Sequence, residues 1–289
     1  MHRRRFLFTA LGAAGVATGA RSAPIEPFDI VYPRVLAGND ARVSFALAVL
    51  DAAMKSVNAP YTIRQSEAIM ERGRALAELA GGEAINLHWT SMEARAERGL
   101  NVIHIPLHRG LIGYRVFLIR KDRQRDFDRV RSLDDLKSLT AGQGLGWVDT
   151  GILRDAGLAV QTSTFDTLFG MTQSGRIDYF PRGVVEAFAE LDARRASEPD
   201  LAVENRLLLK YRSDFLFYVG RSHTRLAEVL AAGFAAAYRN GSYMNLFNTH
   251  PYIQNALARA NLAGRTLIQI DNPYLSEADR QIPDQYWMS

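Results

Sequence analysis

Two histidines lie four residues apart, a spacing with which a helix can present two ligands to one metal ion. They are His104 and His108, and Pro106 stands between them. Because proline breaks a helix, the two rings are not expected to face the same ion. The chain has no cysteine, which excludes thiol catalysis, cysteine-ligated zinc and disulfides. It also lacks the His-Glu-x-x-His and Gly-x-Ser-x-Gly patterns. The sequence therefore predicts no metal site, no cofactor and no catalytic site.

A glycine-rich turn predicts an anion-binding helix start. Residues 142–147 contain three glycines, and a helix is predicted to begin near Asp149. The N-terminus of a helix offers unpaired N–H groups and the positive end of a dipole, so Thr150 and Gly151 are candidate ligand contacts. Asp149 is acidic, and its alternative role is that of the N-cap. The glycine spacing does not complete a dinucleotide-binding fingerprint.

The charge balance of the chain is set by its N-terminus. The 289 residues include 35 Lys and Arg and 31 Asp and Glu, which gives a net charge of +4. Four of the arginines lie in the first 22 residues, which contain no acid. The rest of the chain is neutral overall, so the basic excess does not indicate nucleic-acid binding. The composition is that of a globular protein, long enough for one large or two modest domains.

Residues 1–23 have the organisation of an export signal. A positively charged start is followed by an apolar stretch at 6–20 and then by small residues. This stretch is short for a membrane span and typical of a signal peptide. Arg3-Arg4-Arg5-Phe6-Leu7 matches the twin-arginine pattern of signals that export folded proteins; the alternative is a Sec signal with an arginine-rich start. Cleavage within 20–23 would release a soluble periplasmic protein.

Beyond the signal, apolar periodicity predicts alternating strands and helices, which is typical of a largely parallel sheet covered by helices. Two such blocks followed by long helices predict an α/β protein of two lobes, between which the chain crosses twice. The predicted strands are 28–32, 61–64, 84–89, 116–119, 160–163, 177–180, 207–209 and 215–219, and the predicted helices are 43–57, 69–79, one from 149, 165–173, 184–196, 224–239 and 243–260.

Four short segments occur in an order and spacing that one protein family shares. Segment 83–95 opens with an acidic residue before a buried strand, and its last residue is an arginine five positions after a threonine. Ser-Leu-Asp-Asp-Leu-Lys at 132–137 and Ser-Gly-Arg-Ile-Asp at 174–178 follow. Residues 217–243 contain a strand, a long helix and a Gly-Ser-Tyr ending. Together, over about 28–250, they resemble extracytoplasmic solute-binding proteins of the polar amino-acid type.

This resemblance implies a type II periplasmic-binding-protein fold, in which two α/β lobes joined by two hinge crossovers close on a ligand. Lobe 1 would comprise residues 28–110 and 213–289, and lobe 2 residues 111–212. The hinges would be 106–113 and 209–213. It also implies a monomer without catalysis that delivers a small molecule to the membrane component of an ABC transporter or to a sensor kinase.

The resemblance further implies which residues bind the ligand. Arg95 stands where the family's arginine forms a bidentate pair with a ligand carboxylate, a role that suits the planar guanidinium. The alternative is a solvated arginine beside acidic neighbours. Thr90 matches a hydroxyl position that helps hold the same carboxylate. His88 and Trp89, and Tyr32 after the first strand, would form a stacking wall or belong to the core.

One position departs from the family pattern. Amino-acid binders carry a carboxylate for the ligand ammonium where this chain has Gly183, and Arg182 precedes it. A buried ammonium there would lack its countercharge. We therefore expect Arg95 and Arg182, on opposite lobes, to bind an anionic or carboxylate-bearing ligand such as a dicarboxylate. The alternative for Arg182 is a solvent-facing side chain.

Two other functions share this scaffold. One is an interaction or sensory module that no longer binds a small molecule, which the altered turn at 147–151 and the missing carboxylate at 183 favour. The other is an exported enzyme. Stabilisation by a ligand would separate the first from a receptor, and turnover would separate the second.

Overall fold

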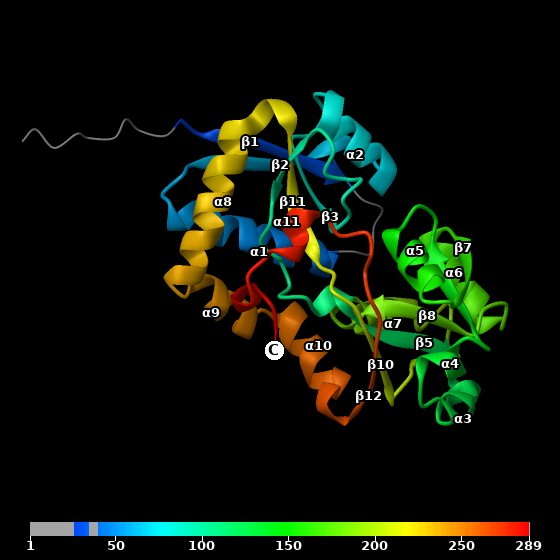
Figure 1. The fold of residues 1–289 in the computed structure, drawn as a ribbon. Helices are drawn as coiled ribbons and strands as arrows, with labels where there is room; N and C mark the ends of the chain where they lie inside the picture. Colours follow the sequence, from blue (N-terminus) through cyan, green and yellow to red (C-terminus); the bar gives the residue numbers. More distant parts are fainter. Residues whose placement is uncertain (1–25, 35–39, 289) are drawn as a thin grey trace, which may run out of the picture.

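The structure is a computed structural model that describes residues 26–34 and 40–288. The predicted export signal at 1–23 lies outside the described residues. Figure 1 shows two α/β lobes, one formed mainly by the blue, cyan and yellow parts of the chain and the other by the green part. Within the described ranges, no helix is long and apolar enough to cross a membrane.

Lobe 1 contains two small sheets. The first is the parallel pair β1 (Phe28–Arg34) and β2 (Tyr61–Ile69), and the second is antiparallel, with β11 (Phe215–Gly220) between β3 (Leu87–Ser91) and β4 (Leu100–Ile103). Five of the six residues of β11 are buried because helices pack against it. This central strand therefore fixes the position of β3 at the inner edge of the lobe.

Helices cover the sheets of lobe 1. The long helices α1 and α8 approach so closely that a Cβ atom at Gly233 would lie 2.3 Å from the carbonyl oxygen of Ala53, so this contact requires glycine. Helices that cover these sheets include α1 (Asp40–Ser56), α2 (Arg72–Gly81), α8 (Thr224–Arg239) and α9 (Ser242–Thr249).

Lobe 2 is built on a seven-stranded sheet. Its strand order is β12-β10-β5-β8-β6-β7, and β9 pairs with β5. Six of the seven residues of β5 are buried, which places this apolar strand at the centre of the lobe. The strands are β5 (Tyr114–Arg120), β6 (Thr140–Gly144), β7 (Ala159–Ser163), β8 (Tyr179–Gly183), β9 (Leu201–Val203), β10 (Leu207–Lys210) and β12 (Thr266–Gln269), and the helices are α3 (Gln124–Phe127), α4 (Leu133–Leu136), α5 (Val148–Asp155), α6 (Phe165–Gln173) and α7 (Val184–Arg194).

Two neighbouring segments connect the lobes. The chain passes from β4 to β5 through 104–113 and returns from β10 to β11 through 211–214. The N–H of Gly113 donates to the carbonyl of Ser213 (3.1 Å), and the N–H of Tyr211 donates to the carbonyl of Gly113 (3.1 Å). A Cβ at Gly113 would lie 2.0 Å from the Tyr211 carbonyl oxygen, so the crossovers could not approach this closely with a larger residue.

The C-terminal part of the chain returns to lobe 2 before it ends on lobe 1. Helix α10 (Pro251–Ala260) packs against α7, and β12 then joins the edge of the lobe 2 sheet beside β10. Next the chain runs between the lobes, red in Figure 1, to the short helix α11 (Glu277–Arg280) on lobe 1. The family resemblance implied that all of 213–289 belongs to lobe 1. Strand β12 instead pairs with β10 in the lobe 2 sheet, and its Ile268 packs into the same apolar cluster as Leu207.

Two predicted helices have different bounds in the structure. The helix predicted at 243–260 is two helices, α9 and α10, because Pro251 cannot continue the first. Pro251 instead occupies the first turn of α10, where the His250 ring accepts a hydrogen bond from the N–H of Tyr252 (3.3 Å). The helix predicted at 69–79 begins only at Arg72, since β2 continues to Ile69.

Candidate functional site

A cavity of about 450 Å³ lies between the two lobes. It is lined by residues from α1, α2, β3 and β11 on one side and from β5, α5, α6, β8 and α7 on the other. Lobe 1 contributes Arg42, Arg72, His88, Trp89, Thr90 and Phe215, and lobe 2 contributes Arg115, Trp147, Asp149, Phe165, Arg182 and Glu186, among others. Both charged side chains and aromatic rings thus line the cavity.

Aromatic rings form opposite walls of the cavity. Trp89 and Phe215 line it from lobe 1, and Trp147 and Phe165, with ring centroids 6.2 Å apart, line it from lobe 2. Tyr32 is buried behind Trp89, with a centroid distance of 5.3 Å, and supports that ring without lining the cavity. Such walls suit a ligand with a flat or apolar part.

Arg72, at the start of α2, connects the two sides of the cavity. Its Nε donates to Thr90 Oγ1 (2.9 Å) and its Nη2 to Glu93 Oε2 (2.6 Å), both in lobe 1. Its Nη1 donates to the carbonyl of Gly146 (3.2 Å), in the turn between β6 and α5 of lobe 2. The side chain is 20% exposed. A single guanidinium therefore contacts both lobes at the edge of the cavity.

Arg115 and Asp149 form a buried pair on the lobe 2 side. Arg115 Nη2 lies 2.5 Å from Asp149 Oδ1, and the Tyr211 hydroxyl donates to the same oxygen. Both charged side chains are at most 5% exposed. Asp149 thus neutralises a buried arginine. The N-cap role that the sequence suggested as its alternative is wrong, because α5 begins at Val148 and its N-cap is Trp147.

Arg182 is buried and fully paired. Its Nε and Nη2 each donate to a carboxylate oxygen of Glu190 at 2.7 Å, a bidentate geometry, and Nη2 also lies 2.9 Å from Glu186 Oε1. The guanidinium carbon lies 4.9 Å from the Trp147 ring centroid. The solvent-facing alternative for this side chain is therefore wrong, and its charge is already balanced by two carboxylates.

Glu186 is the centre of the buried charges. Burial alone would raise its pKa, but Arg182, Arg42 and Arg115 lower the pKa of Glu186 to about 2. Its carboxylate also accepts a hydrogen bond from the N–H of Gly183 (3.1 Å). This chain lacks the family's carboxylate at 183 and has one three residues later, at Glu186, where arginines already surround it.

His88 leaves one ring nitrogen without a hydrogen bond. Its Nε2 is buried and has no hydrogen-bond partner among the described residues. Burial, and secondarily the charge of Arg72, lower the pKa of His88 to about 3. The ring is therefore neutral at pH 7, and Nε2 can accept or donate one hydrogen bond according to the tautomer.

Comparison with known proteins shows which solved structures have a similar fold. Neither models of protein families nor curated protein sequences match the chain. An ancestral arginine-binding protein bound to arginine matches at a TM-score of 0.55 and 15% identity, over 79% of this chain and 100% of that chain. A histidine kinase sensor domain similar to periplasmic binding proteins matches at 0.56 and 14%, over 79% and 97% of the two chains. The substrate-binding protein of an amino acid ABC transporter matches at 0.50 and 15%, over 78% and 98%.

The chain has the periplasmic-binding-protein fold. The predicted two-lobed α/β architecture is confirmed, and so is the similarity to amino-acid-binding proteins of the periplasm. At these identities the likeness concerns the fold alone, so the ligand has to be argued from the side chains.

Four of the residues singled out in the sequence line the cavity of this periplasmic-binding-protein fold. They are His88, Trp89, Thr90 and Arg182. The first three belong to β3, whose inner edge faces the cavity. Thr90 is buried, and its hydroxyl accepts from Arg72. A ligand in the cavity could therefore stack on Trp89 and contact the Thr90 hydroxyl, as the sequence analysis expected.

The other four lie outside the lining of the cavity. Arg95 is exposed in the turn that follows β3, and Tyr32 is buried behind Trp89. The Thr150 hydroxyl lies 3.5 Å from the Gly144 carbonyl. Gly151 is covered by the tail of the chain, because a Cβ there would lie 2.5 Å from the Tyr274 ring. These positions do not support the contacts that the sequence suggested for them.

Three arginines of the cavity were not identified from the sequence. Arg42, Arg72 and Arg115 lie on different elements, and only their tertiary positions bring them together. The one local signal is the position of Arg72 in the first turn after a strand, at the edge where parallel strands and helices meet. Such edges carry ligand sites in α/β folds, but the signal does not choose between neighbouring residues.

The two histidines of the 104–108 segment point to different partners. His108 is buried, and its Nδ1 lies 3.0 Å from Asp214 Oδ1 in the crossover. His104 Nδ1 lies 3.1 Å from Asp279 Oδ1 in the tail. The pair thus does not form one metal site, as Pro106 predicted.

Proposed function

We propose that this protein is a periplasmic solute receptor that closes its two lobes on a small carboxylate-bearing molecule. The observation that carries this proposal is the cavity of about 450 Å³ with Arg72 at its edge. A volume of this order is typical of small-molecule sites between domains. The contact of Arg72 with Gly146 favours a closed arrangement, because this hydrogen bond breaks when the lobes separate.

Arg72 is the proposed anchor of the ligand carboxylate. A guanidinium has five N–H donors, and three hydrogen bonds from Arg72 are described above. Two N–H donors remain, enough to hold a carboxylate edge. Glu93 neutralises much of the positive charge of Arg72. Hydrogen bonds would therefore hold the ligand carboxylate more than net electrostatic attraction would.

The remaining charges of the cavity define the kind of ligand. Within the described part of the chain, each arginine of the lining has a carboxylate partner: Arg42 with Glu186, Arg72 with Glu93, Arg115 with Asp149 and Arg182 with Glu190. A ligand with several negative charges would meet no unbalanced cation there. The aromatic walls favour a flat or apolar body. We therefore propose one carboxylate on such a body in preference to a dicarboxylate.

We further propose that residues 1–23 direct the chain to the periplasm, where it acts as a monomer without turnover. Its partner would be the membrane component of an ABC transporter or a sensor kinase. The similar solved structures include a histidine kinase sensor domain and the substrate-binding protein of an amino acid ABC transporter.

A thermal-shift screen of the purified protein tests this function. The panel would hold amino acids, aromatic and aliphatic monocarboxylates, dicarboxylates and sugars. Binding to the folded state alone adds about 2.7 kcal/mol of stability at a hundredfold excess over Kd. We expect a clear rise in Tm with at least one monocarboxylate, and recovery of that compound unchanged by mass spectrometry. Conversion of the compound would establish an enzyme instead.

A second candidate function is an interaction or sensory module without a small ligand. The observation that favours it is the complete pairing of the four lining arginines with the protein's own carboxylates. In that case no compound of the panel raises Tm, and the cavity residues serve only to hold the lobes together.

A further inference from the structure

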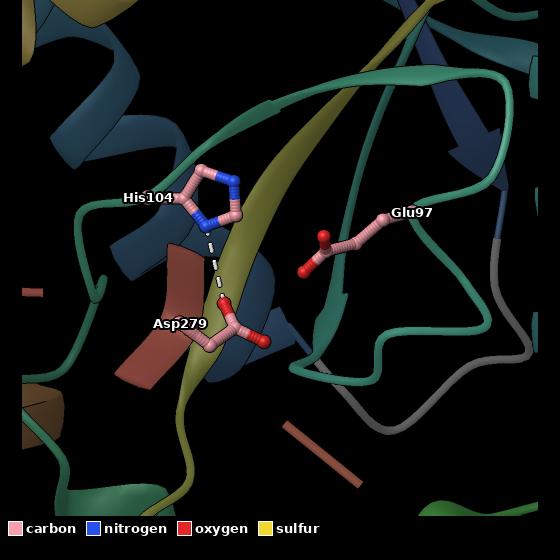
Figure 2. A group of neighbouring side chains, drawn as sticks. All are labelled: Glu97, His104 and Asp279. Atoms are coloured by element: carbon pink, nitrogen blue, oxygen red, sulfur yellow. Dashed lines mark hydrogen bonds and ion pairs between the residues drawn. The ribbon is translucent and has the colours of Figure 1, made fainter. Parts of the chain in front are cut away.

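Three side chains outside the lining of the cavity meet on lobe 1. Glu97 lies in the turn between β3 and β4, His104 follows β4 directly, and Asp279 belongs to α11 near the end of the chain. One ligand atom from each lies within 4.8 Å of the other two. Figure 2 shows the carboxylate of Glu97 turned toward the His104–Asp279 pair.

His104 is the one group of this cluster that can carry a positive charge. Asp279 is completely buried, and His104 is 29% exposed. Oε1 of Glu97 is buried and has no hydrogen-bond partner in the described part of the chain. Among those residues, neither carboxylate forms an ion pair with a lysine or arginine. A buried carboxylate beside a half-buried one is stabilised by a positive charge between them.

Local hydrogen bonds hold one carboxylate in place. Asp279 Oδ2 accepts from the N–H of Ser276 (3.2 Å), and the N–H of Asp279 donates to Ser276 Oγ (3.0 Å), the reciprocal pattern of a capping box. Oδ1 is thereby directed to the His104 ring (3.1 Å). A ligand oriented by such outer contacts is typical of metal sites.

We propose that Glu97, His104 and Asp279 bind one Zn²⁺ ion. Two carboxylate oxygens and one imidazole nitrogen suit a borderline divalent cation, and zinc commonly takes three protein ligands with water in the fourth position. Zinc bonds of about 2.0–2.2 Å place tetrahedral ligands roughly 3.4 Å apart. The present spacing of up to 4.8 Å therefore closes with small rotations of the side chains.

The ion would fasten the tail of the chain to lobe 1. Upstream of Asp279, the carbonyl of Tyr274 accepts from the N–H of Ala94 (2.8 Å), while its ring covers Gly151 of lobe 2. Strand β12 anchors the other end of this segment in the lobe 2 sheet. Zinc at Asp279 would thus secure a third connection between the lobes.

Metal analysis of the untagged protein tests the site. The protein is stripped with EDTA, dialysed against Zn²⁺ and measured by plasma mass spectrometry. We expect one equivalent of zinc and a higher Tm. In Glu97→Gln the affinity should fall at least about tenfold, as for the loss of a metal-site contact. Glu83→Gln and His223→Gln are the controls, because they remove the same groups elsewhere on lobe 1.

Three outcomes would overturn the proposal. They are no bound zinc in the wild type, equal zinc affinity in Glu97→Gln, and loss of zinc in the controls. The far-UV and near-UV circular dichroism of Glu97→Gln must match the wild type, since an unfolded variant loses any site. His104→Gln serves as the second variant if Glu97→Gln is unfolded, and the proposal requires the same loss of affinity there.

Discussion

Replacement of His88 by asparagine is expected to reduce the acid sensitivity of the fold. The pKa of His88 is lowered from 6.5 to about 3, first by burial and then by Arg72. Between these two values the unfolded chain binds a proton at this position and the folded chain does not. The free energy of unfolding therefore falls as the pH falls from 6.5 toward 3, and it is unaffected by this group at higher pH.

The size of the effect follows from the displacement of the pKa. Each pH unit below 6.5 costs about 1.4 kcal/mol for one such proton. Between pH 7 and pH 5 the wild type should lose about 2 kcal/mol through His88, because the folded ring stays neutral throughout. Asparagine does not titrate. The free energy of unfolding of His88→Asn should therefore lack this part of the decline between pH 7 and pH 5, even if the variant is less stable at pH 7.

Urea unfolding of both proteins at pH 7, 6 and 5 measures the difference. The matched control is His223→Asn, at a histidine that does not line the cavity, and its curve should keep the decline that His88 causes. If the curves of His88→Asn and wild type are parallel from pH 7 to pH 5, the ring is not held neutral in the fold, and its assignment as a neutral cavity residue is refuted.

Two further predictions concern packing and buried charge. Arg182→Met leaves the buried Glu190 without its partner and removes one of the three arginines around Glu186. It should cost roughly 3–5 kcal/mol in urea unfolding; a loss below about 1 kcal/mol would show that the side chain faces water. Gly233→Val forces a side chain against the carbonyl of Ala53 and should cost about 1–3 kcal/mol. Gly73→Ala, in α2 with open space around it, should be neutral or stabilise by up to about 1 kcal/mol, and a comparable loss in both variants would contradict the packing argument.

Helices and strands were predictable from the sequence where the pattern of apolar residues within one segment indicates its structure. Apolar periodicity placed the long helices α1 and α8 and the buried strands β5 and β11, because burial on one or both faces leaves a pattern in the residues themselves. Strand β6 was missed, since Thr-Ala-Gly-Gln-Gly is not a strand-like sequence and is held by pairing with β7 and β8.

The site was predictable only in part because its contacts join distant segments. Spacing singled out Arg95, but the turn after β3 leaves that side chain exposed, and Arg72 reaches the cavity from another helix. In the same way, His104 was judged by its distance from His108, while its partner Asp279 lies 175 residues away. Local spacing cannot reveal pairs that the tertiary fold creates.

The most direct test of the account compares Arg72→Ala with Arg95→Ala in isothermal titration with the compound that gives the largest thermal shift. The family resemblance implies that Arg95 binds the ligand carboxylate, whereas we propose Arg72. We predict that Arg72→Ala weakens binding at least about tenfold, as expected from a lost charge-assisted hydrogen bond of about 1.5–3 kcal/mol. Arg95→Ala, with its exposed side chain, should bind as the wild type does. Loss of binding in Arg95→Ala with binding retained in Arg72→Ala would contradict the proposed site.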